Sequence, residues 1–227
     1  MRFLSVRVVC FALVITCGVT SQSGEPVTAA SSCGPAPKRI EIPGVHNAFY
    51  VTDQVLSGSQ PEGDKTFAAL AKLGVKTIIS VDGAKPDAEA ARRYGLRYVH
   101  LPFGYDGVPA NRVAELTKAA GHDSSPVYVH CHHGLYRGPT AVAIICEATA
   151  NWTTNQAQAW MRDAGTASEY AGLYRSAATF KKPTPEQLAA VNDLPEVAKS
   201  SSVVEAMVGI DEHFSRLKLS QNQSRQC

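Results

Sequence analysis

The segment with the clearest chemistry pairs a cysteine with an arginine six positions later. Cys131 and Arg137 enclose the residues His132, His133, Gly134, Leu135 and Tyr136, none of which is proline. Successive backbone N–H groups in such a loop can converge on one anion. The planar guanidinium of an arginine can also bind two oxygens of the same anion, which a lysine cannot do. The segment therefore predicts an anion-binding loop that includes residues 132–137.

The elements expected around this loop make Cys131 a candidate nucleophile. An apolar strand at 127–130 leads into the cysteine, and an apolar helix at 139–150 begins shortly after Arg137. Cysteines at helix N-termini or beside cations ionise more easily than free cysteines, so we expect a thiolate at neutral pH. A thiolate beneath a bound phosphate is placed to attack phosphorus. The alternative is a core cysteine in an ordinary turn between a strand and a helix.

A second Cys-x5-Arg pattern shows that the spacing alone is not sufficient. Cys33 and Arg39 have the same separation, but Pro35 and Pro37 remove two N–H donors between them. Neither a strand nor a helix is expected beside that segment. The flanking elements, rather than the spacing, therefore distinguish Cys131.

Short apolar strands alternate with helices along the chain as far as residue 150. Strands are expected at 48–51, 54–56, 75–81, 96–103 and 127–130, and helices at 64–73, 86–94, 109–120 and 139–150. This alternation is typical of right-handed β-α-β units. It predicts an α/β fold with a central, mainly parallel sheet of four to five strands, flanked by helices.

Beyond residue 151 the pattern becomes wholly helical and predicts a helical C-terminal layer. Helices are expected at 155–163, 167–179, 185–191 and 202–217. We expect five regions: a signal peptide at 1–29, a linker at 30–41, an α/β domain at 42–182, a helical appendage at 183–219 and a loose tail at 220–227. The linker follows from its Ser, Gly, Pro and Ala content.

The first residues have the pattern of an export signal. Arg2 and Arg7 precede an apolar run at 8–19, which is followed by a small polar stretch at 20–24. Such a run is too short to span a membrane permanently, and the order is typical of a secretory signal peptide. We therefore expect a periplasmic or secreted protein. The alternative is a lipoprotein signal, in which a lipid on Cys17 would anchor the chain to a membrane.

Composition limits the remaining function classes. The chain has 227 residues, 44% of them hydrophobic, and a formal net charge of +2. This composition excludes a disordered chain, and so weak a charge argues against nucleic-acid binding through a broad basic surface.

Removal of the signal peptide would leave four cysteines, which are Cys33, Cys131, Cys146 and Cys227. Cys33 and Cys227 lie at opposite chain ends, which often sit close together, so they are either a disulfide pair or two terminal thiols. Cys146 falls within an apolar helix and is expected to be a buried small side chain.

The motif His130-Cys131-x5-Arg137 resembles the signature of the cysteine-dependent protein tyrosine phosphatase superfamily, particularly its compact dual-specificity-like bacterial members. The resemblance extends over about residues 42–180, and segment 51–61 is similar to the opening of small bacterial proteins of this kind. It implies that Cys131 forms a phosphocysteine intermediate and that Arg137 binds phosphate and stabilises the transition state. It also implies that His130 supports the thiolate, and that residues 132–137 bind phosphate.

The resemblance further implies a general acid on a loop. Asp106, in segment 101–109, is the expected acid, because it stands just after a strand end and 25 residues before Cys131. The alternative for Asp106 is an Asp-Gly turn without chemistry. Asp82, after the strand at 75–81, is the reserve candidate.

Two features depart from the family pattern. Gly138 stands directly after the arginine, where the family usually has Ser or Thr, and Thr140 comes two residues later. We therefore expect phosphate binding and the first transfer step to survive but turnover to be slow. His132 and His133 are also unusual there. A metal site is the alternative for these histidines, but we expect no metal and no cofactor. The two side chains are expected to shape the rim of the loop or to add positive charge below about pH 6.5.

The sequence thus predicts a secreted cysteine-dependent phosphatase that hydrolyses phosphate monoesters of a protein or a small molecule. One alternative is a rhodanese-like sulfurtransferase, in which the cysteine carries a persulfide and Asp106 has no role. The other alternative, suggested by Gly138, is a phospho-ligand binding module with little turnover. We expect no nucleic-acid partner, and contact with a membrane only if Cys17 is lipidated.

Overall fold

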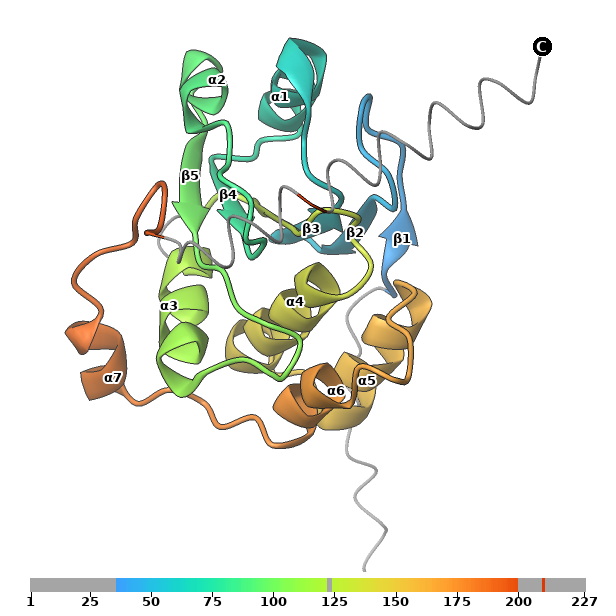
Figure 1. Ribbon diagram of the computed structural model, residues 1–227, viewed down its shortest axis with the longest axis vertical. Coiled ribbons are helices and arrows are strands. Elements are labelled where there is room, and N and C mark those ends of the chain that lie inside the picture. The colour runs from blue at the N-terminus through green and yellow to red at the C-terminus, as the bar shows by residue number, and fades with distance from the viewer. Residues whose placement is uncertain (1–35, 122–123, 200–209, 211–227) are drawn as a thin grey trace, which may run out of the picture. The chain divides into compact units, whose positions relative to one another are not determined.

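The computed structural model describes residues 36–121, 124–199 and 210, and its centre is a six-stranded sheet (Figure 1). The strands are β1 (Lys38–Arg39), β2 (Phe49–Thr52), β3 (Val55–Gly58), β4 (Thr77–Ser80), β5 (Arg97–His100) and β6 (Val127–His130). They lie in the order β1-β2-β3-β6-β4-β5. The pairs β3–β6, β6–β4 and β4–β5 are parallel, and β1 and β2 are antiparallel additions at one edge. The expected mainly parallel sheet is confirmed.

The sheet contains β1 in addition to the five strands expected from the sequence. β1 pairs with β2 through Lys38 opposite Tyr50 and Arg39 opposite Phe49. These residues fall inside the segment expected to be a linker, so the sheet begins before residue 42. A strand of two charged residues at a sheet edge has no apolar alternation, and the sequence therefore gave no signal for it.

Helices cover both faces of the sheet (Figure 1). They are α1 (Gly63–Lys72), α2 (Ala88–Arg93), α3 (Ala110–Ala120), α4 (Arg137–Thr149), α5 (Thr154–Asp163), α6 (Ala171–Ala178) and α7 (Pro185–Ala190). α1 and α2 lie on one face, and α3 to α6 on the other. A separate apolar core fills each side, and β6 contributes Tyr128 to the first core and Val129 to the second. This division follows from the alternation of side chains along a strand.

α4 is the central helix of the larger core. Its residues 138–148 are all buried, because it packs against α3, α5 and α6 as well as against the sheet. This environment explains why the sequence is apolar almost all round the helix. The helix begins at Arg137, two residues before the expected start, and so Arg137 itself belongs to its first turn.

The segment after α6 returns to the other edge of the sheet. The Lys118 ammonium on α3 donates to the Leu188 carbonyl of α7 (3.2 Å), and the His100 N–H at the end of β5 donates to the Pro195 carbonyl (2.8 Å). Within the described residues, no helix has the length and apolar character that crossing a membrane requires. The expected signal peptide, Cys17, Cys33 and Cys227 lie outside the described residues, as does the helix expected at 202–217 apart from Ile210.

Candidate active site

β6 and α4 place the Cys131–Arg137 loop at the carboxyl end of the parallel strands. Cys131 follows β6 directly, and β6 lies between β3 and β4 in the sheet. The chain after β4 is tied to the same end, because the Val81 N–H donates to the His130 carbonyl (3.0 Å). Loops at this edge of an open parallel sheet are the usual location of ligand sites. The expected strand–loop–helix arrangement is therefore present.

The loop lies against the end of β3 so closely that one position requires glycine. Gly134 has a φ of +70°, a left-handed backbone conformation that favours glycine. A Cβ at this position would collide with Gly58 and would lie 2.6 Å from the Ser59 nitrogen. The loop can adopt this path only because residue 134 has no side chain.

Neighbouring segments hold several carbonyl groups of the loop. The Gln60 N–H donates to the His132 carbonyl (3.1 Å) and the Asn47 side-chain amide donates to the Gly134 carbonyl (2.9 Å). The Thr166 hydroxyl donates to the Leu135 carbonyl (2.8 Å). The path of the loop is thus fixed from outside by three separate parts of the chain.

The Cys131 thiol is buried beneath the first turn of α4. Its residue is 3% exposed, and neither Cys131 nor Cys146 forms a disulfide. A Cβ on Gly138 would lie 3.4 Å from the Cys131 Sγ and 3.1 Å from its backbone nitrogen. A side chain at position 138 would thus touch the sulfur at ordinary contact distance and press slightly on the Cys131 nitrogen, which places this position directly beside the thiol.

The carboxylate of Asp82 contacts this loop at both of its ends. One carboxylate oxygen accepts from the Arg137 Nη2 (2.6 Å) and from the His132 backbone N–H (2.9 Å), and the other accepts from the Ala84 N–H (2.9 Å). The two side chains of this ion pair are 5% and 14% exposed, for Asp82 and Arg137 respectively. Burial raises the pKa of Asp82, but the guanidinium and the N–H donors outweigh it and hold the pKa below its ordinary value. Asp82 is therefore an anion at neutral pH.

Two contacts hold the Arg137 guanidinium in place and leave its Nε–H without a hydrogen-bond acceptor among the described residues. Asp82 holds one terminal nitrogen, and the ring of Tyr105 lies 4.7 Å from the central carbon of the guanidinium. The Nε–H of Arg137 is buried and has no hydrogen-bond partner among the described residues. An oriented guanidinium with an unpaired buried N–H is suited to binding an anion.

Asp106, the expected general acid, lies on a loop that is attached to α6. The Ser176 hydroxyl accepts the Val108 N–H (2.9 Å), and a Cβ on Gly172 would collide with the Asp106 carbonyl. In the described part of the chain, Asp106 forms no hydrogen bond or ion pair with Cys131 or Arg137. It is, however, the residue next to Tyr105, whose ring packs on Arg137.

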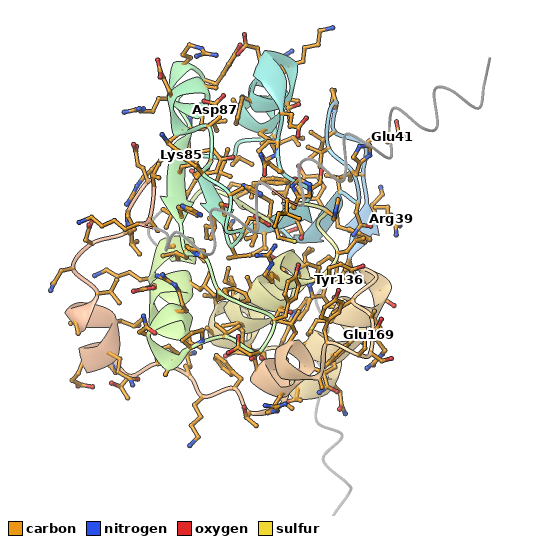
Figure 2. All side chains as sticks on the ribbon, viewed as in Figure 1. Arg39, Glu41, Lys85, Asp87, Tyr136 and Glu169 are labelled. Carbon is orange, nitrogen blue, oxygen red and sulfur yellow. The ribbon has the colours of Figure 1, made fainter. Side chains whose placement is uncertain are left out.

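Three tyrosine rings form a continuous group beside Arg137, which we call the tyrosine cluster (Tyr105, Tyr136 and Tyr170). Tyr105 stacks on Tyr170 with ring centroids 5.0 Å apart, and Tyr136 lies 4.5 Å from Tyr170. Tyr136 immediately precedes α4 (Figure 2). Tyr105 is 43% exposed, so the cluster presents an aromatic surface at the mouth of the loop.

The three histidines near Cys131 have different environments. His130 is buried, and its Nε2 lies 3.3 Å from the Tyr98 hydroxyl. Burial lowers the pKa of His130 to about 4, so this imidazole is neutral at pH 7. The rings of His132 and His133 pack edge to face, 4.4 Å apart. The described residues contain no cluster of three or more His, Cys, Asp or Glu side chains suited to a metal ion.

Several residues at this site were not recognised from the sequence. Asn47, Thr166, Tyr105 and Tyr170 were not singled out, and Asp82 was considered only as a reserve acid. Asn47 lies 87 residues from Gly134, and Asp82 lies 55 residues from Arg137. Contacts over such separations have no local sequence signal. The available clue was Asp82 itself, a carboxylate at the end of a core strand.

No family model matches this sequence. Among curated proteins, the histidinol dehydrogenase of Halalkalibacterium halodurans is 32% identical over 111 residues, which are 49% of this chain. The match covers 24% of that enzyme, so the chain spans about a quarter of the length of this relative.

Solved structures of cysteine-based phosphatases have the same fold. TpbA from P. aeruginosa superposes with a TM-score of 0.54 and 20% identity, covering 69% of this chain and 96% of TpbA. The core catalytic domain of the PP-IP phosphatase SIW14 from S. cerevisiae gives a TM-score of 0.56 and 15% identity, covering 70% of this chain and 100% of that domain. At these identities the likeness establishes a shared fold. The resemblance to tyrosine and dual-specificity-like phosphatases is thus confirmed at the level of the fold.

Proposed function

We propose that the protein hydrolyses phosphate monoesters through a phosphocysteine intermediate on Cys131. The observation that carries this proposal is the unpaired, buried Nε–H of Arg137 at the edge of a loop that begins at a buried, free thiol. A buried donor without a partner costs about 1–3 kcal/mol. A phosphate oxygen would remove this cost and would at the same time bring phosphorus to the Cys131 sulfur.

The reaction divides into two transfers. The Cys131 thiolate forms a bond to phosphorus as the ester P–O bond breaks, and the departing oxygen takes a proton from Asp106. Water then attacks phosphorus, the S–P bond breaks, and Asp106 accepts the proton of the water. Inorganic phosphate leaves, and the thiolate is restored. A positioned acid of this kind contributes about 10²–10⁴ to the rate.

We assign the acid to Asp106 and not to Asp82 because their environments differ. Asp82 is ionised, and both of its oxygens already accept hydrogen bonds from Arg137 and the backbone. A carboxylate in this state has no proton to donate. Its role is to orient the guanidinium, whereas Asp106 follows Tyr105, whose ring packs on Arg137, and is assigned as the acid that protonates the leaving group.

The tyrosine cluster favours an aromatic leaving group. Aromatic rings attract one another in stacked and edge-to-face arrangements, typically with centroids about 4.5–7 Å apart. The ring of an aryl phosphate bound at Arg137 could stack on Tyr105, which lies beside the guanidinium, whereas the aliphatic side chain of phosphoserine has no ring for such a contact. We therefore propose phosphotyrosine or another aryl monoester as the substrate class.

The place of action is proposed from the sequence alone. The charged start, apolar run and polar exit at residues 1–24 support export to the periplasm or the medium, with lipid anchoring at Cys17 as the alternative. Sequencing the N-terminus of the protein purified from each cell fraction tests this, since a chain that keeps residue 1 in the cytoplasm would refute export.

Gly138 favours a second candidate, a phospho-ligand binding module, because no hydroxyl is present directly after Arg137 to help the sulfur leave. Rapid mixing with an aryl phosphate distinguishes the candidates. A phosphatase of slow turnover gives a burst of product equal to the enzyme concentration, and a binding module gives none. A sulfurtransferase would retain its activity when Asp106→Asn removes the proposed acid.

A further inference from the structure

We propose that Asn47 and Thr166 are positioning residues, which aim the backbone N–H groups of Leu135 and Tyr136 at the bound phosphate. The inference rests on the proposed function, because it concerns the same anion site. It adds two residues outside the loop, on segments that carry no part of the Cys-x5-Arg motif.

The geometry of a peptide group couples the direction of each carbonyl to that of the next N–H. In a trans peptide the carbonyl and the following N–H point in opposite directions, and every peptide bond in the described part of the chain is trans. A contact that draws a carbonyl outward therefore turns the next N–H inward. The hydrogen bond from Asn47 holds the Gly134 carbonyl in an outward direction and thereby directs the N–H of Leu135 inward. Thr166 draws out the carbonyl of Leu135 and so sets the N–H of Tyr136.

The N–H groups set in this way are not used elsewhere. Neither the Leu135 nor the Tyr136 N–H donates to an acceptor within the described residues, whereas the His132 N–H is taken by Asp82. The two unused donors lie in the same loop as the unpaired Nε–H of Arg137. The two backbone donors, on half-buried residues, and the buried Arg137 Nε–H thus stand together in one short loop, which indicates a shared ligand with several acceptor oxygens.

Asn47 is itself held rigidly. Its φ is +51°, a left-handed conformation that asparagine tolerates better than most residues. Its side-chain amide donates to the Ala164 carbonyl (2.7 Å) as well as to Gly134, and its oxygen accepts from Arg39 (3.1 Å). Both ends of the amide are therefore occupied, which fixes the direction of the hydrogen bond to the loop.

Thr166 is held in a comparable way. It is buried, its N–H donates to the Met161 carbonyl (2.8 Å) and its carbonyl accepts from the Tyr174 hydroxyl (2.7 Å). The hydroxyl that reaches Leu135 thus projects from a backbone fixed by α5 and α6. Asn47 also contacts the segment of Thr166 through the Ala164 carbonyl, but the two side chains bond to different loop carbonyls, so each should act mainly on the N–H that follows its own carbonyl.

Titration with inorganic phosphate, followed through the backbone ¹⁵N–H resonances, tests this inference without requiring catalysis. Thr166→Val removes the hydroxyl at nearly constant volume, and Thr166→Ser restores it. Thr117→Val is the matched control, because the Thr117 hydroxyl makes an equivalent bond to the Val113 carbonyl on α3, outside the loop. Asn47→Gly removes the amide and keeps a residue suited to positive φ.

We expect Thr166→Val to weaken phosphate binding about fivefold to tenfold, which corresponds to one hydrogen bond. The phosphate-induced shift of the Tyr136 resonance should shrink while that of Leu135 persists, and Asn47→Gly should have the opposite pattern. Thr166→Ser and Thr117→Val should behave as the wild type. This difference between two resonances would not arise from a general loss of stability, and the threonine variants keep the test open if Asn47→Gly fails to fold.

Unchanged phosphate affinity in Thr166→Val, or equal loss of both shifts in both variants, would overturn the inference. The inference would also be overturned if the Leu135 and Tyr136 resonances of the wild-type protein did not shift when phosphate is added. A wild-type protein that binds phosphate with the expected pattern but leaves monoesters intact would support the inference and refute the proposed phosphatase activity. The two proposals therefore fail in distinguishable ways.

Discussion

The substitution Asp82→Asn tests whether this carboxylate orients Arg137. Asparagine has nearly the same shape, but it offers one acceptor oxygen to three donors, which are Arg137 and the N–H groups of His132 and Ala84. The Arg137 guanidinium would lose its partner while it remains largely buried. Breaking a buried ion pair costs about 3–5 kcal/mol, and the remaining amide oxygen would recover part of this. We expect a net loss of about 3 kcal/mol in the interaction energy that holds the Arg137 guanidinium in place.

If that energy orients Arg137 for the transition state, kcat/KM should fall about 10²-fold, since each factor of ten corresponds to about 1.4 kcal/mol. Steady-state hydrolysis of p-nitrophenyl phosphate measures kcat/KM. The dependence of kcat/KM on pH then distinguishes a residue that orients Arg137 from one that acts as the general acid. Asp82→Asn should lower kcat/KM by the same factor at every pH. Asp106→Asn should instead abolish the fall of kcat/KM at high pH, which reflects deprotonation of the general acid. Asp87→Asn is the matched control, because Asp87 caps α2 far from Tyr136 (Figure 2).

Stability should change in the same variant with a defined pH dependence. The folded-state pKa of Asp82 lies below the ordinary value of 3.8, so its contribution to the free energy of unfolding is complete above that value. The contribution is lost as the pH falls through the folded-state pKa. Urea unfolding should therefore show Asp82→Asn less stable than wild type at pH 7 and nearly equal to it in strong acid. A kcat/KM within twofold of wild type, or loss of the fall of kcat/KM at high pH in Asp82→Asn alone, would refute the reasoning.

Three further predictions concern the loop and its surroundings. Tyr105→Ala should reduce the preference for aryl over alkyl phosphates about twofold to tenfold, because it removes a ring contact worth about 0.5–1.5 kcal/mol. Competition between the two substrates measures this, and an unchanged preference would exclude the cluster as the determinant. Gly138→Ser should raise the steady-state rate after the burst, because it places a hydroxyl near the Cys131 sulfur. Gly138→Ala introduces the same Cβ without the hydroxyl and should not raise the rate. Equal rates in the two variants would assign the effect to the added Cβ. Gly134→Ala should lower the free energy of unfolding by about 2–4 kcal/mol, because the added Cβ would collide with Gly58 at the end of β3 and the residue would have a positive φ. A change below about 0.5 kcal/mol in a urea titration would contradict this close packing.

Local patterns were sufficient for most of the fold. The alternation of apolar strands and helices predicted the parallel sheet, and the uniformly apolar helix after Arg137 predicted the central α4. The expected start at Pro139 was wrong by two residues, because the loop enters the helix directly at Arg137. The helix expected at 167–179 is shorter, since α6 begins only at Ala171.

The motif residues of the site were also predictable, because Cys131 and Arg137 are close in sequence and flanked by recognisable elements. The contact between Asp82 and Arg137 was not, because it depends on β6 lying beside β4, and strand order cannot be read from a single sequence. The same reason applies to Asn47, which meets the loop across 87 residues. Local chemistry identified the nucleophile, whereas the residues that orient it required the topology.

In the proposed reaction the Cys131 sulfur becomes bonded to phosphorus. Acid quenching within the first turnover of an aryl phosphate, followed by peptide mass spectrometry, measures this directly. We expect one phosphoryl group on the peptide that contains Cys131, and neither this adduct nor hydrolysis in Cys131→Ser. Hydrolysis that continues in Cys131→Ser, or that proceeds in the wild type through a phosphoryl group on another residue, would contradict it.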